Sequence, residues 1–160
     1  MDKMMQNQKI NDEKYLQFSC AGEKYAIPLL KVREVIGVPK TTPTPYSPQY
    51  FLGIMNLRGK VISIVDLCKK LQVKNSDKVE ENAVVIVEID DVLLGLKVDS
   101  VDRVVVPDKD SFSESGKVKG NHKNQFIAGV FRYEEQLIVL FDVDKMLSSD
   151  DVRFASKESA

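Results

Sequence analysis

The sequence has little of what most enzymes use for catalysis. Among 160 residues it contains one histidine, His122, and two cysteines, Cys20 and Cys68. A catalytic histidine needs an orienting carboxylate and a nearby nucleophile on rigid elements, and the polar loop around His122 suggests neither. One histidine excludes a multi-histidine metal site, and two cysteines without CxxC spacing argue against zinc. The sequence therefore predicts no catalytic residue, no metal ligand and no cofactor.

A basic excess, a long apolar run and a secretory signal are also missing. The net charge is -1 and the pI is near 5.9, which argues against a nucleic-acid partner. No apolar run exceeds six residues, which excludes a spanning helix, and the first fourteen residues carry no apolar signal core. Both cysteines lie in apolar patterns and read as small buried side chains in a reducing compartment. We expect a cytoplasmic protein without direct membrane insertion.

One stretch, residues 53–67, organises the rest of the chain. It reads as a strand, a tight turn and a second strand rich in β-branched side chains. Gly59 gives the turn a position that tolerates positive φ, which places Arg58 at the tip of a stiff hairpin. Asp66 is well placed to cap a short helix over residues 67–71.

Short strands with turn signals fill most of the remaining chain. Further strands are expected over residues 15–20, 25–27, 83–89, 92–98, 126–131 and 137–141, and a second short helix over 143–147. Val32, Val35 and Ile36 recur at i, i+3 and i+4, which favours a single helical turn. Residues 1–14 are expected to form a mobile leader and residues 148–160 a mostly polar tail.

The two halves of the chain resemble each other. A shift of 69 positions places Ile27, Val32 and Val35 on Leu96, Val101 and Val104. A shift of 76 places Gly53-Ile54 on Gly129-Val130, Val61-Ile62 on Leu137-Ile138, and Asp66 on Asp142. Short strands repeated twice suggest two similar small antiparallel barrels that share a core. The charged segment near 74–82 is the best candidate for the boundary between the subdomains.

The repeat inverts in charge at two places. The hairpin tip with Arg58 is matched by Glu134-Glu135, and Glu34 is matched by Arg103. A turn with a purely structural role would have little reason to carry opposite charges in its two copies. Both places are therefore candidates for a partner surface, although a solvated turn cation is the simpler reading of Arg58 alone.

Several segments of the sequence resemble a known family. Tyr25-Ala26-Ile27-Pro28, Val32-Arg33-Glu34-Val35 and above all the segment from Gly53 to Leu67 are similar to the CheW family of chemotaxis adaptors. The resemblance covers residues 15–147 and departs from the family pattern at Ser63, where proline is usual, and at Cys68, where arginine is common.

The resemblance implies an all-β fold of two SH3-like, five-stranded barrel subdomains with short helices, in one domain over 15–147 whose barrel halves interleave. It implies a non-catalytic adaptor that couples methyl-accepting chemoreceptor tips to the regulatory domain of the histidine kinase CheA, recruited to membrane-bound receptor arrays. When the contact positions of the family are transferred to this sequence, the resemblance implies an interface with receptor or kinase at these residues: Val32, Glu34, Asn56, Leu57, Arg58, Gly59, Val98, Val101 and Val104.

Other functions remain open from the sequence alone. The same fold could serve as a regulatory module of a CheA-like kinase or as an adaptor of a non-flagellar sensory pathway. A small hydrolase would use His122 with a serine such as Ser111, Ser113 or Ser115. A nucleic-acid-binding barrel would show binding that falls steeply with salt, and the near-neutral charge argues against it.

Overall fold

The structure is a computed structural model that describes residues 13–73, 82–114 and 126–159. The expectations for the leader up to residue 12, for the segment 74–81, and for His122 and Ser115 lie outside these ranges. None of the helices in the described ranges is both long and apolar enough to cross a membrane.

Eleven strands in the described ranges carry the fold. The first half of the chain contributes β1 (Tyr15–Cys20), β2 (Glu23–Pro28), the 3-10 turn η1 (Leu29–Lys31), β3 (Val32–Gly37), β4 (Phe51–Leu57), β5 (Lys60–Asp66) and α2 (Leu67–Lys70). The second half contributes β6 (Ala83–Ile89), β7 (Val92–Val98), β8 (Ser100–Val105), the 3-10 turn η2 (Lys109–Ser111), β9 (Ser113–Glu114), β10 (Ile127–Tyr133), β11 (Gln136–Phe141), α3 (Val143–Met146) and α4 (Ser149–Ser159).

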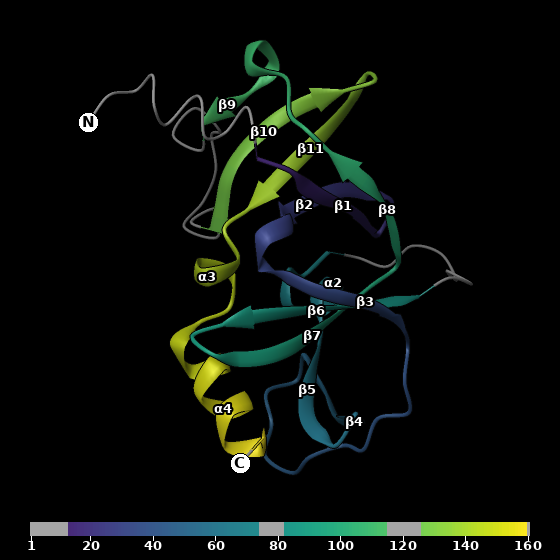
Figure 1. Cartoon of the computed structure of the whole chain (residues 1–160), viewed down its shortest axis with the longest axis vertical. Helices are drawn as coiled ribbons and strands as arrows, with labels where there is room; N and C mark the ends of the chain where they lie inside the picture. Colours follow the sequence, from purple (N-terminus) through teal and green to yellow (C-terminus); the bar gives the residue numbers. More distant parts are fainter. Residues whose placement is uncertain (1–12, 74–81, 115–125, 160) are drawn as a thin grey trace.

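The strands form two sheets, stacked along the long axis of the molecule (Figure 1), and each sheet contains strands from both halves of the chain. The strand order is β8-β1-β2-β11-β10-β9 in sheet A and β3-β6-β7-β5-β4 in sheet B. Hairpin β1–β2 therefore completes a sheet whose other strands come from the second half, and hairpin β6–β7 does the same for the first. The expectation of two similar β subdomains is confirmed, with the two-residue β9 as an additional strand.

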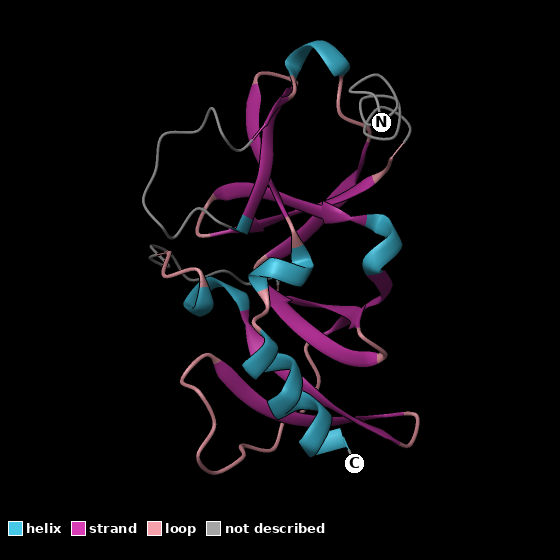
Figure 2. Ribbon diagram, turned by 90° about the vertical axis from the view of Figure 1, so that its left-hand side faces the viewer, coloured by secondary structure: helices cyan, strands magenta, loops and turns pink. Residues whose placement is uncertain are grey.

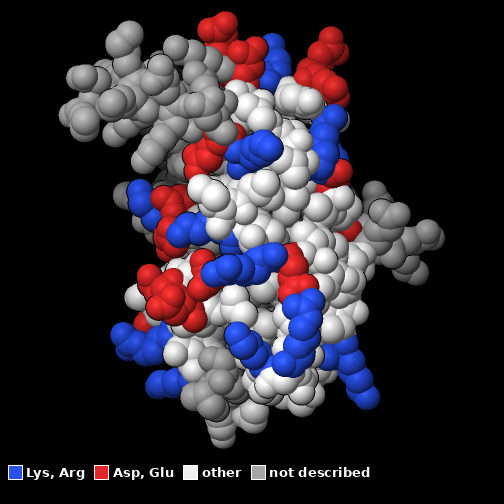
Figure 3. Space-filling view, viewed as in Figure 1, with Lys and Arg blue, Asp and Glu red and all other residues white. Residues whose placement is uncertain are grey.

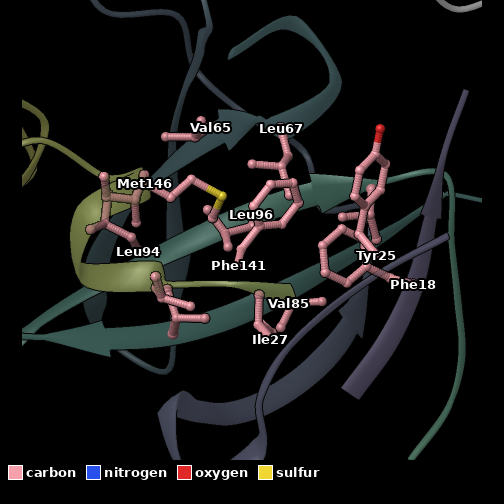
Figure 4. Close-up of a cluster of buried hydrophobic side chains, with 14 of the residues drawn as sticks. Phe18, Tyr25, Ile27, Val65, Leu67, Val85, Leu94, Leu96, Phe141 and Met146 are labelled. Carbon is pink, nitrogen blue, oxygen red and sulfur yellow. The ribbon is translucent and has the colours of Figure 1, made fainter. Parts of the chain in front are cut away.

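Three apolar clusters hold the sheets together. Each sheet curls around its own cluster, and a sheet with its cluster is called subdomain A or B after the sheet. All five strands of sheet B contribute to the cluster in subdomain B. A larger central core lies between the sheets, and Figure 4 shows Phe18 and Ile27 there together with Leu94 and Phe141 from the other half. Strand β1 is buried throughout, and β6 and β7 are buried at most positions, because one face meets a subdomain cluster and the other meets the central core.

Two local expectations are wrong. Val32, Val35 and Ile36 lie in strand β3, with Val32 and Ile36 on its more buried face, because β3 pairs with β6 and six residues are too few for a helical period to be decisive. The expected polar tail forms helix α4, which lies against sheet B (Figure 2) and begins with a reciprocal cap between Ser148 and Asp151.

Four hairpins turn through two residues that both have positive φ. These pairs are Ala21-Gly22, Arg58-Gly59, Asp90-Asp91 and Glu134-Glu135. Two consecutive residues with positive φ are typical of the type I′ turn, which matches the twist of the flanking strands. Asp90 and Asp91 are therefore the turn residues between the strands expected over 83–89 and 92–98.

Replacing Glu135 by glycine is expected to raise the free energy of unfolding by about 0.5–1 kcal/mol. Glu135 has a φ of 66°, where a Cβ is unfavourable, and its counterpart in the repeat is Gly59. Urea denaturation of the two proteins measures the difference. Glu135→Ala is the control, because it removes the carboxylate and keeps the Cβ. An equal gain in both variants would assign the effect to charge and not to backbone strain.

Candidate partner-binding surface

The tip of the β4–β5 hairpin is a rigid turn that presents Arg58. Arg58 and Gly59 have φ values of 52° and 87°, and the Gly59 N–H donates to Asn56 Oδ1 at 2.8 Å. Asn56 therefore holds the turn in shape from within the hairpin. No side chain or backbone lies within 4 Å of where a Cβ on Gly59 would be, so the glycine serves the backbone conformation and not a close approach.

Arg58 forms a two-pronged ion pair with Glu34 on the facing end strand β3. Its two terminal nitrogens donate to the two carboxylate oxygens at 3.0 and 2.8 Å. The Arg58 side chain remains 75% exposed and that of Glu34 27% exposed. The pair therefore orients the guanidinium and leaves most of it accessible to a partner.

A hollow of about 940 Å³ borders this ion pair at the open end of subdomain B. Its apolar lining comes from Val61, Ile62, Ile86, Val92 and Leu93, and its polar lining from Arg33, Glu34, Lys60, Glu88 and Asp91. Concave surfaces with an apolar floor and a charged rim are typical places for a partner side chain to insert.

The charge inversion between the halves has an explanation within the fold. In subdomain A, Arg103 donates to Glu134 at 3.0 Å, and these residues occupy the places of Glu34 and Arg58. Each turn is thus joined to the third strand of its own subdomain by an ion pair, with the signs exchanged. The inversion is consistent with a structural role, and it is not by itself evidence for a binding surface.

The valines predicted for the interface fall into three classes, whereas the predicted Leu57 is partly buried against the apolar cluster of sheet B. Val32 and Val101 are partly buried and pack against the central core. Val104 is 48% exposed, whereas Val98 is only 1% exposed and belongs to the central core. The expectation that Val98 lines a partner surface is wrong, because strand β7 is covered on both faces.

Two exposed apolar residues near this surface were not predicted from the sequence to belong to the interface. Leu30 in η1 is 86% exposed and precedes Val32 by two residues, and Val35 on β3 is 42% exposed. Val35 is the repeat counterpart of Val104, which could have identified it, whereas nothing in the apolar sequence around Leu30 distinguishes it from a core residue. Figure 3, which has the same view as Figure 1, shows uncharged surface near the middle of the molecule, with charged side chains around it.

The burial predicted for both cysteines is confirmed. Cys20 and Cys68 are free and buried, and a hydrogen bond with Cys68, together with burial, raises the pKa of Cys20. A protonated, inaccessible thiol is a poor nucleophile. Within the ranges that the structure describes, no three histidine, cysteine or carboxylate side chains gather as metal ligands do.

Comparisons with known proteins find similar sequences over most of the chain. The family described as "CheW-like domain" matches residues 14–151. A "Probable chemotaxis protein CheW" of Rhizobium etli is 25% identical over 140 residues, which cover 88% of this chain and 90% of the relative. "Chemotaxis protein CheW" of Rhizobium meliloti is 28% identical over 137 residues, which cover 85% of this chain and 88% of the relative.

A solved structure is similar in both fold and sequence. The crystal structure of the scaffolding protein TtCheW from Thermoanaerobacter tengcongensis superimposes with a TM-score of 0.76 at 28% identity. The match covers 87% of this chain and 94% of that one.

Proposed function

This chain belongs to the CheW-like domain family and is a chemotaxis adaptor, and we propose that it couples methyl-accepting chemoreceptors to the histidine kinase CheA without chemistry of its own. We place it in the cytoplasm, recruited to membrane-bound receptor arrays. The observation that carries the proposal is the family match over residues 14–151, which includes the complete Asn56–Gly59 hairpin tip.

The receptor contact that we propose involves the exposed apolar residues where the chain crosses between the sheets. A receptor tip is a bundle of helices, and an apolar surface accommodates the amphipathic face of a helix. Leu30 and Val104 are exposed on these segments, and Val32 and Val101, which are near them in sequence, are partly buried against the central core. Arg58 and Glu34 would add a charged contact that sets orientation and register more than affinity.

The kinase contact that we propose pairs subdomain with subdomain, because the regulatory domain of CheA is expected to share this fold. The hollow beside Arg58 and the exposed Val35 are accessible to such a partner. Signalling further requires that the assembly bind differently in its kinase-on and kinase-off states, since an adaptor with equal affinity for both would transmit nothing.

Replacing Arg58 by glutamate is expected to weaken binding to a receptor tip fragment or to the CheA regulatory domain by roughly tenfold or more. Titration of each partner by calorimetry measures the effect. The substitution also places two carboxylates together at positions 34 and 58, so stability needs its own control. Loss of an exposed pair changes stability by only about 1 kcal/mol or less.

The chain itself provides the matched control. The variant Glu34→Arg/Arg58→Glu reproduces the pair that subdomain A already forms with Arg103 and Glu134. It should fold with wild-type stability and still bind weakly, because the partner meets the opposite sign. Binding equal to wild type in both variants would remove the hairpin tip from the interface. Failure of the wild-type protein to bind either partner would contradict the adaptor function itself.

A further inference from the structure

Each subdomain is completed by a hairpin from the other half of the chain. Hairpin β1–β2 lies between β8 and β11 in sheet A, and hairpin β6–β7 lies between β3 and β5 in sheet B. Because the halves are repeats, a second arrangement has an equivalent strand order. In this local arrangement hairpin β1–β2 would pair with β3, and hairpin β6–β7 would pair with β8, each with the third strand of its own half. The observed arrangement, in which the hairpins change places, is called the exchanged arrangement. Something in the sequence must favour the exchanged arrangement over the local one.

The third strand of each half carries a bulge at the point where it meets the hairpin. The register of β3 against β6 shifts between Val32 and Glu34, which leaves Arg33 as the extra residue. The register of β8 against β1 shifts between Val101 and Arg103, which leaves Asp102 as the extra residue. Arg33 and Asp102 are 69 positions apart and are therefore equivalent, with opposite charges.

Both bulge residues form contacts that cross between the halves. Arg33 forms an ion pair with Glu88 on hairpin β6–β7. Asp102 accepts hydrogen bonds from Ser19, Gln17 and Lys24 on hairpin β1–β2, at 2.9, 3.1 and 3.2 Å.

These contacts have a measurable electrostatic consequence at Asp102. Burial alone would raise the pKa of Asp102, but the hydrogen bonds from Ser19, Gln17, Lys24 and Ser100 outweigh it and lower the pKa.

The same charges would conflict in the local arrangement. The shift of 69 places Ser19 where Glu88 lies, and Lys24 where Leu93 lies. Arg33 would then face Lys24 with no acid, and Asp102 would face Glu88 with no base. We propose that the charges on the two bulges and the two hairpins select the exchanged arrangement.

Two other ion pairs serve as an internal reference. Glu34–Arg58 lies within the first half and Arg103–Glu134 within the second. Both pairs are the same in either arrangement, so they stabilise a subdomain without selecting its hairpin. Among the ion pairs named here, those at the bulges are the ones that join a third strand to the hairpin of the other half.

The test exchanges the lysine at position 24 on hairpin β1–β2 with the glutamate at position 88 on hairpin β6–β7. The variant Lys24→Glu/Glu88→Lys has the composition and net charge of the wild-type protein, but each bulge now matches the hairpin of its own half. The variant reverses one partner in each of two cross-half ion pairs, Arg33–Glu88 and Lys24–Asp102, and both pairs are partly exposed, so each contributes modestly. Loss of the two attractions is expected to lower the equilibrium constant for folding into the exchanged form by roughly tenfold.

Hairpin location is read out by cutting the chain between the halves. A protease site inserted between Asn75 and Ser76 in the full-length protein allows cleavage after folding. In the wild type each sheet needs both fragments, so the fragments should stay together in gel filtration. In Lys24→Glu/Glu88→Lys the two fragments should dissociate at a protein concentration roughly tenfold higher than that at which the wild-type fragments dissociate.

Two further variants make the outcome decisive. Adding Arg33→Glu and Asp102→Arg restores matching charges across the halves and should restore wild-type association. Glu34→Arg/Arg58→Glu alters a pair within one half and should leave fragment association unchanged. Fragments of Lys24→Glu/Glu88→Lys that associate as tightly as wild type would overturn the proposal. So would a four-fold variant that is no better than the double variant, even where the double variant fails to fold.

Discussion

Replacing Gly53 by alanine is expected to lower the free energy of unfolding by about 3 kcal/mol or more. Gly53 has a φ of 140°, a backbone conformation that side chains rarely adopt. A Cβ there would lie 2.3 Å from the carbonyl oxygen of Thr42 and 3.0 Å from Cα of Pro43. These neighbours are backbone atoms, so no side-chain rotation relieves the overlap.

The close approach at Gly53 has a clear structural purpose. The N–H groups of Thr42 and Ile54 donate to each other's carbonyl oxygens, both at 2.8 Å, and this bridge pins the loop after β3 across strand β4. The repeat has an equivalent backbone approach at Gly129, where β9 pairs Ser113 with Val130 and the Ser113 carbonyl oxygen lies 2.8 Å from the position of a Cβ. An alanine at position 53 would therefore break the bridge as well as strain the backbone.

Two other glycines turn this prediction into an ordered series. Gly37 has no atoms within 4 Å of its Cβ position and no positive φ, so Gly37→Ala should change stability little. Gly59 has a φ of 87° but open space around it, so Gly59→Ala should cost about 1 kcal/mol from backbone conformation alone. Chemical denaturation of the three variants measures the order. If Gly53→Ala were no worse than Gly59→Ala, the close approach to Thr42 would carry no weight.

The sequence predicted the local features well because their signals are local. Turn residues flanked by β-branched runs predicted the hairpins, and the carboxylates of Asp66 and Asp142 do accept hydrogen bonds from Lys69 and Lys145 at the starts of α2 and α3. The repeat predicted two similar subdomains because its offsets preserve the alternation of buried and exposed residues. The resemblance to CheW adaptors added the expectation of interleaved halves.

The features that were missed depend on contacts between distant residues. The ion pairs of Glu34 with Arg58 and of Arg103 with Glu134 join residues 24 and 31 positions apart, so the charge inversion had no visible cause in the sequence. Burial of Val98 follows from a second layer that covers strand β7. Helix α4 did have a local signal, the Ser148-x-x-Asp151 cap, which its polar surroundings obscured.

Replacing Asp151 by alanine is expected to destabilise the protein by roughly 3 kcal/mol. The Asp151 side chain is 1% exposed and holds α4 to the rest of the molecule. It accepts from Lys70 Nζ at 2.7 Å, from the Tyr50 hydroxyl and from the Ser148 N–H at 3.1 Å. Removal of the carboxylate leaves the Lys70 ammonium, itself 10% exposed, without its counter-charge.

The same interaction predicts how stability depends on pH. Burial alone would raise the pKa of Asp151, but hydrogen bonds from Lys70 and Tyr50 outweigh it and lower the pKa below its ordinary value of 3.8. A carboxylate with a lowered pKa stabilises the folded state fully above that ordinary value, and this contribution is lost as the pH falls through the folded pKa. The stability difference between wild type and Asp151→Asn should therefore be constant near neutral pH and shrink on acidification below pH 4.

Asp150 supplies the matched control for both measurements. It lies next to Asp151 in the first turn of α4, carries the same charge near the same helix terminus, and is exposed to solvent. Asp150→Ala should therefore cost about 0.5 kcal/mol, the usual effect of a carboxylate on an exposed helix start. If the two alanine variants were equally stable, the buried network would contribute no more than the helix dipole does. A large loss at Asp151 alone would show that α4 is a structural part of subdomain B, fixed by one carboxylate that joins Lys70 of α2, Tyr50 before β4 and the helix itself.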